Sequence, residues 1–488
     1  MVKALVAKNT TYLTVSSLLQ KLLAFWWFAY VANQLGEELL GSYLYALTYT
    51  SIFVIIMNFG LIPVLTREGA KYKETLQEQF NLALSLKIVL TVMSLVVLFA
   101  VYYILQQVRE LPPSTSLLVY LASIVIVFDT FRSIFLAVLR ARQAMQYEAV
   151  GQFIYQVLVV GFGIAFFGLG YKAGGLIMAI IIASIFYMLF ALVVMYKRAE
   201  IKLGWYWRWD QVKKLLLIAA PFALADIFFK LNGSIDTVML QYLSGERYVA
   251  WYGIALKLTV TLTVIPGAFA TAFFPSMSRA FAESKEDLRS IFEQFFIYIL
   301  MLSAPIAVGA AITAPRIIAL VYPTFPAATI ALQIFMVGLI FLFANYPIGN
   351  LLNATNHQLL NTINMAIALV VNIVLNFFLI PSYTYIGATI AAVITAVVLV
   401  TLGFPRVYHE IHFNIALLMK RSLAILGSAA TMGIIIWLAA SWAPSTTIGF
   451  LIIAAIAVVV YGIMLVLLRA LRWQDIAHLL QIVRKKIV

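Results

Sequence analysis

Residues 173–195 read AGGLIMAIIIASIFYMLFALVVM, a run that contains no charged residue. A helix needs about 20 mostly apolar residues to cross the hydrocarbon core of a bilayer, so this run predicts a membrane span at 173–197. The whole chain has the same character, because 64% of its 488 residues are apolar and 11% are charged. A typical soluble domain has about 25% charged residues. We therefore predict an all-α polytopic membrane protein.

Similar apolar runs recur along the chain and predict about fourteen spans. They cover 12–34, 39–66, 80–107, 116–139, 147–168, 173–197, 212–240, 248–276, 289–313, 325–353, 359–380, 386–408, 419–441 and 446–470. Lys3 and Lys8 precede the first run without a short apolar region and cleavage site, so we expect this helix to be retained. The tail at 471–488 mixes leucines with basic residues and predicts an amphipathic surface helix.

If the N-terminus is placed in the cytoplasm, most basic residues fall on the cytoplasmic side of the membrane. The connections that would then face inward carry 24 of the 33 lysines and arginines, whereas the outer loops carry four: Arg109, Lys172, Arg247 and Arg316. This asymmetry is typical of an inner-membrane protein with both termini cytoplasmic. The net charge of +14 is therefore interpreted as loop charge, and nucleic acid is not an expected partner.

An internal repeat relates the two halves. LGEELLGSYLYAL near residue 35 resembles LSGERYVAWYGIAL near residue 243, and one shift of 209 residues also places Lys21 on Lys230. Six spans separate the copies, so both have the same orientation, which is typical of parallel repeats. We predict an N-lobe at 1–200, a C-lobe at 201–410, two extra helices at 411–470 and the cytoplasmic tail at 471–488. Two six-helix lobes would enclose a central cavity, and a monomer is sufficient to form it.

We single out eight ionisable residues inside the predicted spans. They are Lys21, Lys87, Asp129, Arg132, Asp226, Lys230, Asp236 and Lys257. Each charge at a lipid-facing helix centre costs about 2.5–3.5 kcal/mol on insertion scales. Most of them must therefore face water or one another, and this is the strongest functional signal in the chain.

The spacing of these residues predicts two pairs and an excess of positive charge. Asp226 and Lys230 are an i,i+4 pair in the favourable order, and Asp129 and Arg132 are an i,i+3 pair. Such pairs can also serve only to hold helices together. Lys21, Lys87 and Lys257 have no acid at helical spacing, and a cationic cavity attracts an anion such as a diphosphate. For Lys87, near a helix end, the alternative is that the amine reaches the interface.

Uncharged polar residues are also present inside the predicted spans, and sequence motifs of enzymes are missing. Asparagines, Asn345 among them, crowd the tenth and eleventh predicted spans, where amides suit either sugar hydroxyls or interhelical hydrogen bonds. His409 and His412 have no evident third ligand. There is no cysteine, and no phosphate-binding Gly-rich loop occurs. We therefore expect that the protein is not an enzyme and binds no metal or organic cofactor. We expect transport that is coupled to H⁺ or Na⁺.

Two stretches carry a family resemblance over nearly the whole chain. LLGSYLYALTYTSIFVIIMNFGL at 39–61 and SIDTVMLQYLSGERYVAWYGIALKLTVTLTVIPGAFATAFFPSMSRAF at 234–281 resemble polysaccharide and O-antigen repeat-unit flippases. These form a branch of the multidrug/oligosaccharidyl-lipid/polysaccharide exporter superfamily. The resemblance implies alternating-access transfer of a polyprenyl-diphosphate-linked oligosaccharide for the cell envelope, beside a glycan polymerase. Lys21, Arg132, Lys230 and Lys257 match the family's cationic cavity by position, with Lys87 and Asn345 as further substrate contacts.

The same resemblance implies roles for the acidic residues and allows three alternative functions. Asp236 lies in a segment similar to the family's seventh-helix motif, and Asp129 and Asp226 would tune the cavity charge or carry a coupling proton. A multidrug or cation antiporter of the superfamily would have an acid-rich cavity. Peptidoglycan-precursor flippases favour arginines where this chain has Lys21 and Lys257. A membrane-embedded glycan polymerase or ligase would need a large outer loop, and the outer connections here are short.

Overall fold

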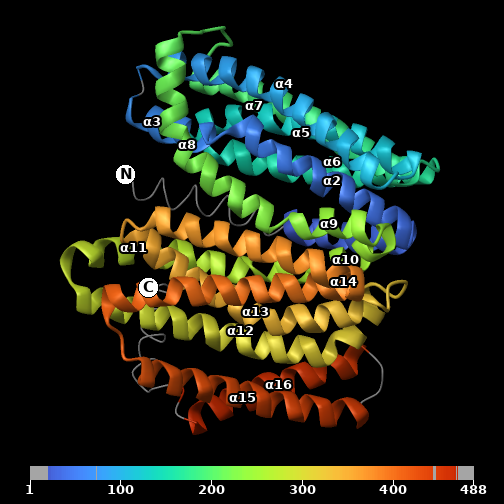
Figure 1. The fold of residues 1–488 in the computed structure, drawn as a ribbon, viewed down its shortest axis with the longest axis vertical. Coiled ribbons are helices and arrows are strands. Elements are labelled where there is room, and N and C mark those ends of the chain that lie inside the picture. Colours follow the sequence, from blue (N-terminus) through green and yellow to red (C-terminus); the bar gives the residue numbers. More distant parts are fainter. Residues whose placement is uncertain (1–19, 73, 443–446, 469, 471–488) are drawn as a thin grey trace. The chain divides into compact units, whose positions relative to one another are not determined.

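The computed structural model describes residues 20–72, 74–442, 447–468 and 470, and the chain forms two compact units, residues 1–250 and 251–488 (Figure 1). Every regular element among the described residues is helical, which confirms the predicted all-α fold. Several predictions lie outside the described residues, namely Lys3, Lys8, the start of the first span and the surface helix at 471–488. The predicted boundaries of lobes and extra helices stay a prediction.

The N-terminal unit begins with a helical segment at residues 20–35. It continues with α2 (Glu37–Asn58), α3 (Leu61–Lys71), α4 (Leu76–Val108), α5 (Pro113–Ala141), α6 (Met145–Gly168), α7 (Lys172–Val194), the π-helical turn η1 (Met195–Ala199), α8 (Trp209–Asn232), α9 (Ile235–Leu243) and the first turn of α10 (Glu246–Leu262). Here α5 packs against α2, α3 and α7, and α6 packs against α7.

The C-terminal unit contains the rest of α10 and the helices after it. These are α11 (Val264–Glu283), α12 (Lys285–Val321), α13 (Ala328–Ala354), α14 (Gln358–Ile411), α15 (Ile415–Trp442) and α16 (Thr447–Leu467). In this unit α13 packs between α12 and α14, and α15 packs against α12 and α16. The hydroxyl of Tyr461 on α16 donates a hydrogen bond to the Met301 carbonyl on α12 at 2.8 Å, which ties the extra helices to the unit.

Ten helices within the described residues are long and apolar enough to cross a membrane. The longest, α14, joins two predicted spans, 359–380 and 386–408. The chain bends between them at Thr384, whose φ of 52° and ψ of −129° are not helical. The multi-pass architecture is therefore confirmed, and the number of about fourteen crossings stays a prediction.

Two predicted spans of the N-terminal unit are broken helices. The span expected at 39–66 divides into α2 and α3 at Phe59 and Gly60, with φ angles of 38° and 68°. The span expected at 212–240 divides into α8 and α9 at Gly233 and Ser234. Gly60 is also required by packing, because a Cβ atom there would lie 2.4 Å from the Ala219 carbonyl oxygen of α8. The first break is therefore held directly against α8.

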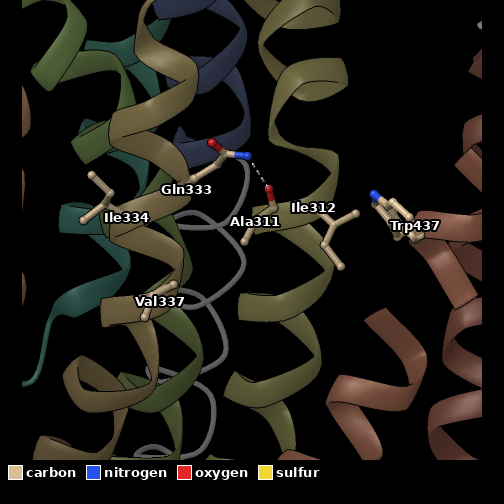
Figure 2. A pocket seen from close by; sticks show the side chains of 6 residues that line it. All are labelled: Ala311, Ile312, Gln333, Ile334, Val337 and Trp437. Carbon is tan, nitrogen blue, oxygen red and sulfur yellow. Dashed lines mark hydrogen bonds between the residues drawn. The ribbon is translucent and has the colours of Figure 1, made fainter. Parts of the chain in front are cut away.

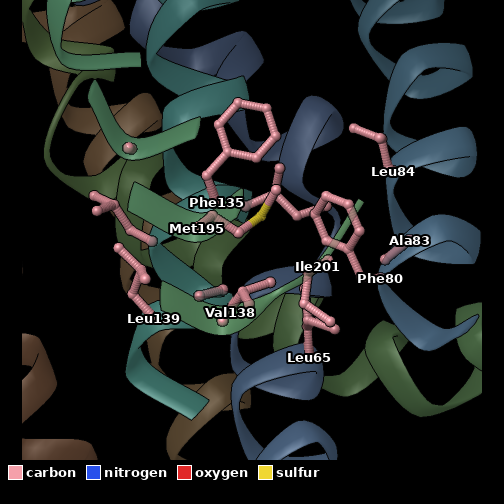
Figure 3. Close-up of a cluster of buried hydrophobic side chains, with 14 of the residues drawn as sticks. Leu65, Phe80, Ala83, Leu84, Phe135, Val138, Leu139, Met195 and Ile201 are labelled. Carbon is pink, nitrogen blue, oxygen red and sulfur yellow. The ribbon is translucent and has the colours of Figure 1, made fainter. Parts of the chain in front are cut away.

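A hydrophobic cluster lies where α3, α4, α5 and η1 meet (Figure 3). Phe80 of α4 and Phe135 of α5 are buried, with ring centroids 6.3 Å apart, and Met195 of η1 and Leu65 of α3 join them. Since these side chains are between 0% and 4% exposed, the cluster fixes one end of the N-terminal unit by apolar burial.

The two copies of the sequence repeat begin their helices in the same way. Gly36 and Gly245 both adopt positive φ, 76° and 114°, and each is followed by a glutamate that starts α2 or α10. The copies also touch within the N-terminal unit. Arg247 Nε lies 2.7 Å from Glu37 Oε2, and a Cβ atom on Gly41 would lie 1.8 Å from the Glu246 carbonyl oxygen.

This close approach predicts that Gly41→Ala destabilises the protein. The added methyl group has no room beside the Glu246 backbone, so α2 or α10 must shift, at a cost of about 1–3 kcal/mol. Reversible unfolding in mixed micelles should show this loss. Gly161→Ala on α6 is the matched control, because no atom lies within 4 Å of the place that its added methyl group would take. Equal stability of the two variants would contradict the packing.

Candidate functional site

The predicted pair on α5 is formed. Arg132 Nη1 lies 2.6 Å from Asp129 Oδ1, and the Ser184 hydroxyl of α7 donates to the same carboxylate oxygen at 2.9 Å. The side chains of Arg132 and Asp129 are 21% and 29% exposed. The pair is thus largely removed from solvent, where its Coulomb attraction is stronger than in water.

Aromatic rings complete the surroundings of Arg132. Its guanidinium carbon lies 4.7 Å from the ring centroid of Tyr187 on α7 and 5.4 Å from that of Tyr155 on α6. Both distances suit cation–π attraction. The Tyr187 hydroxyl donates at 2.9 Å to the carbonyl of Glu148, whose carboxylate pairs with Arg140. The charged group on α5 therefore holds three helices together while keeping an edge exposed.

Lys87 lies in the interior of the N-terminal unit rather than at the interface. Its side chain is fully buried on α4, and its ammonium donates at 2.6 Å to Asn58 Oδ1, at the end of α2. The same oxygen accepts from Thr130 of α5 at 3.0 Å. A cation at the C-terminus of a helix interacts favourably with the helix dipole. In this conformation Lys87 supports the break between α2 and α3 and is closed to any substrate.

The repeat-related lysines lie at more accessible places. Lys21 is exposed on the helical segment at 20–35, and Lys230 is half-buried near the end of α8. Asp226 is exposed one turn before Lys230, but the described structure contains no ion pair between them, so the expected i,i+4 pair is not formed here. Neither lysine forms an ion pair with any described acid.

The remaining predicted residues occupy different environments. Asp236 is 4% exposed on α9 of the N-terminal unit. In the C-terminal unit Lys257 is exposed on α10 and Asn345 is half-buried on α13. The structure thus brings Asp129 and Arg132 into contact, whereas Asp226 and Lys230 do not form the predicted pair.

The asparagines near Asn345 serve in part as structural hydrogen-bond donors. Asn350 of α13 donates to the Ala270 carbonyl of α11 at 3.0 Å, and Asn376 donates to Asn372 at 3.0 Å within α14. The Asn350 bond supports the interhelical alternative for that residue, whereas the Asn376 bond lies within one helix. Among the described residues no group of three or more metal-binding side chains occurs, and His357 instead contacts Arg406.

An open pocket of about 540 Å³ lies between α12, α13 and α15 of the C-terminal unit. Figure 2 shows its six lining residues: Ala311, Ile312, Gln333, Ile334, Val337 and Trp437. The amide nitrogen of Gln333 donates to the Ala311 carbonyl at 3.2 Å. Apart from Gln333 this lining is apolar, and it carries no charge, so the pocket does not suit a diphosphate.

Sequence reasoning missed the partners of the intramembrane charges. Asn58, Tyr155 and Tyr187 come from other helices than the charges they contact, and a single sequence carries no signal for contacts across such distances. The neighbourhood of Gly60 in MNFGLIP did carry a signal, since glycine and proline together indicate a break.

The polysaccharide biosynthesis protein family model matches residues 6–281 of this chain, more than half of its length. A second model, MatE, matches residues 221–378. The capsular polysaccharide biosynthesis protein CapF of Staphylococcus aureus is 21% identical over 402 residues, which cover 80% of this chain and 96% of that protein. An uncharacterized membrane protein of Methanocaldococcus jannaschii is also 21% identical, over 81% of this chain and 96% of its own.

Solved structures share the fold. The lipid II flippase MurJ in an inward closed conformation has a TM-score of 0.74 at 17% identity, covering 94% of this chain and 98% of that one. An inward-facing multidrug resistance transporter of the MATE family has a TM-score of 0.66 at 18% identity, covering 82% and 98%. At such identities the likeness shows the fold.

The helical spans define a multi-pass membrane protein, and its fold is the one shared by MurJ and the MATE transporters. The chain belongs to the polysaccharide biosynthesis protein family. The resemblance seen in the sequence is thereby confirmed.

The contact between Asp129 and Arg132 predicts a measurable coupling energy. A double-mutant cycle of Asp129→Asn and Arg132→Gln should give about 1–2 kcal/mol, because the pair is mostly buried and shares the Ser184 hydrogen bond. Arg289 and Glu293 on α12, 3.1 Å apart and 41% and 24% exposed, form the control pair, for which about 0.3–0.5 kcal/mol is expected. Equal couplings would contradict the special environment of Arg132.

The position of Lys87 predicts that its shape matters more than its charge. Lys87→Met should remain folded and keep transport, because the stem still fills the site while Asn58 keeps its hydroxyl partner. Lys87→Ala leaves a cavity and should unfold about 2–5 kcal/mol more easily than Lys87→Met. Loss of transport by a well-folded Lys87→Met variant would instead make Lys87 a substrate contact in another conformation.

Proposed function

We propose that this protein is a flippase that moves a polyprenyl-diphosphate-linked oligosaccharide across the cytoplasmic membrane by alternating access. The proposal places it in cell-envelope polysaccharide synthesis, beside a glycan polymerase, and treats it as a transporter rather than an enzyme. The match to the polysaccharide biosynthesis family supports the substrate class. The capsular biosynthesis relative points the same way.

The observation that carries the proposal is the positive charge of Lys21 and Lys230. Both lie in predicted membrane spans at repeat-related positions, both reach the surface of the described structure, and neither forms an ion pair with a described acid. A lysine left on lipid would cost about 2.5–3.5 kcal/mol near the bilayer centre. Water-filled surroundings avoid that cost, and two ammonium groups then suit the charge of a diphosphate.

Arg132 and Lys257 extend this set in our proposal. Arg132 keeps an exposed edge while Asp129 takes part of its charge, so an incoming anion would compete with the carboxylate for the guanidinium. Lys257 is exposed on α10. Asn345, half-buried on α13, is proposed to meet sugar hydroxyls. Lys87 is left out of the proposed contacts because it is enclosed.

Ion coupling is proposed to use the carboxylates. Asp226 is exposed and forms no ion pair among the described residues, so it is available to bind H⁺ or Na⁺ when water reaches it. Asp129 is the second candidate, since loss of its charge would release Arg132. Asp236, buried on α9, is proposed only to adjust the local charge.

A multidrug or cation antiporter is the second candidate. The MatE model match and the MATE structural likeness favour it. Its cationic cargo would require acids without neighbouring cations; Asp226 meets this requirement, whereas Arg132 occupies Asp129. A peptidoglycan precursor is a third candidate cargo, and it shares the diphosphate chemistry of the main proposal.

The test is leaflet-resolved transport in proteoliposomes with a short fluorescent polyprenyl-diphosphate sugar and a membrane-impermeant quencher. Wild-type protein should move the probe, and Lys21→Gln/Lys230→Gln should slow it about tenfold or more, because each lost ion contact with the diphosphate is worth about 1.5–3 kcal/mol. Lys172→Gln/Lys285→Gln removes the same charge outside the proposed site and should keep the wild-type rate.

Two other results would decide against the proposal. Unchanged transport by a folded Lys21→Gln/Lys230→Gln variant would contradict the anion-binding role of these lysines. Absence of diphosphate transport together with proton- or sodium-driven export of cationic drugs would establish the antiporter instead.

A further inference from the structure

The segment between η1 and α8 is an extended strap tied to the first turns of α4. The Lys202 N–H donates to Gln77 Oε1 at 2.8 Å, and Gln77 Nε2 donates back to the Lys202 carbonyl at 2.7 Å. Further along, the Tyr206 N–H donates to Ser85 Oγ at 3.0 Å. The Tyr206 hydroxyl donates to Glu78 Oε1 at 2.6 Å. This strap, residues 200–208, is therefore held in one register.

Alternation along the strap creates an aromatic face. Side chains of successive residues in an extended chain point in opposite directions, so the face opposite Tyr206 carries Trp205 and Trp207, followed by Trp209 at the start of α8. Trp205 and Trp207 stack with centroids 6.1 Å apart, and Trp209 meets Trp207 edge-on at 5.3 Å. Trp205 and Trp209 are 64% and 72% exposed.

Positive charge surrounds this aromatic face. Residues 197–214 contain six basic and two acidic residues, a net of +4. Lys202, Arg208, Lys213 and Lys214 are all exposed, and none of them forms an ion pair with a described acid. The nearby Glu78 is engaged by Tyr206. Aromatic rings beside exposed cations, next to the candidate membrane span Lys172–Ala199, match the chemistry of a lipid headgroup layer that carries negative charge.

We propose that residues 197–214 form a binding site for anionic lipid headgroups. Trp205 and Trp209 would enter the interfacial layer, and Lys202, Arg208, Lys213 and Lys214 would contact the lipid phosphates. The strap leads directly into α8, which packs on Gly60 at the break of α2 and α3 and carries Lys230. Bound lipid therefore fixes the start of the helix that bears a proposed substrate contact, although lipid binding itself does not depend on the proposed cargo.

The experiment measures tryptophan quenching in nanodiscs that contain the full chain. Brominated phosphatidylglycerol is compared with brominated phosphatidylcholine at equal mole fraction. The signal of Trp205 and Trp209 is obtained as the difference between wild type and Trp205→Phe/Trp209→Phe. Phosphatidylglycerol should quench this difference signal roughly threefold more strongly, and high salt should remove the preference.

Charge variants identify the source of the preference. Lys202→Gln/Lys213→Gln/Lys214→Gln should quench equally with both lipids. The control Lys71→Gln/Lys285→Gln/Lys420→Gln removes three exposed lysines elsewhere and should keep the wild-type preference. Thermal unfolding checks that all variants are folded.

The contrary results are equally distinct. Equal quenching of wild type by both lipids, or a preference that survives loss of the three lysines, would overturn the headgroup site. Quenching by neither lipid would overturn contact of the strap with the bilayer. All of these results are independent of transport, so failure of this proposal and failure of the flippase proposal can be told apart.

Discussion

Removal of water from around charged groups is the constraint on which this structure depends. In a bilayer, a charge without a partner or water is costly, and this chain nevertheless keeps ionisable residues such as Lys87, Asp129 and Arg132 within its predicted spans. The N-terminal unit meets the constraint in two ways. Arg132 pairs with a carboxylate and packs against two tyrosine rings while keeping an edge exposed, whereas Lys87 is buried against the end of a broken helix. Charged groups whose burial is compensated by neighbouring side chains stabilise the unit. Charged groups that stay accessible can bind a ligand.

The helix breaks are part of the same solution. A continuous helix presents no free carbonyl groups or side-chain caps in its interior, but the interruption at Phe59 and Gly60 ends α2 inside the unit. Asn58 thereby offers one amide oxygen to side chains of α4 and α5. Because α8 lies against Gly60, the break, the buried lysine and the helix that carries Lys230 are mechanically linked. A shift in the position of one of them therefore displaces the others.

The sequence predicted the fold better than the site. Composition and apolar periodicity are properties of each segment alone, so the helical spans and the multi-pass architecture followed from them. The i,i+3 contact of Asp129 with Arg132 also followed, since it lies within one helix. The i,i+4 spacing of Asp226 and Lys230 did not produce a pair, because spacing permits a contact without enforcing it. The partners Tyr155, Tyr187 and Asn58 come from other helices. Which helices pack against one another cannot be read from a single sequence.

The claim at the centre of this account is that accessible intramembrane cations select a diphosphate. The most direct measurement is the transport rate in proteoliposomes of three probes that share one fluorescent sugar and one polyprenyl chain and differ only in the linker: diphosphate, monophosphate or neutral ether. The account predicts fast movement of the diphosphate, movement slower by about tenfold or more for each phosphate removed, and a steeper dependence on salt for the diphosphate. Equal rates for all three linkers would contradict it.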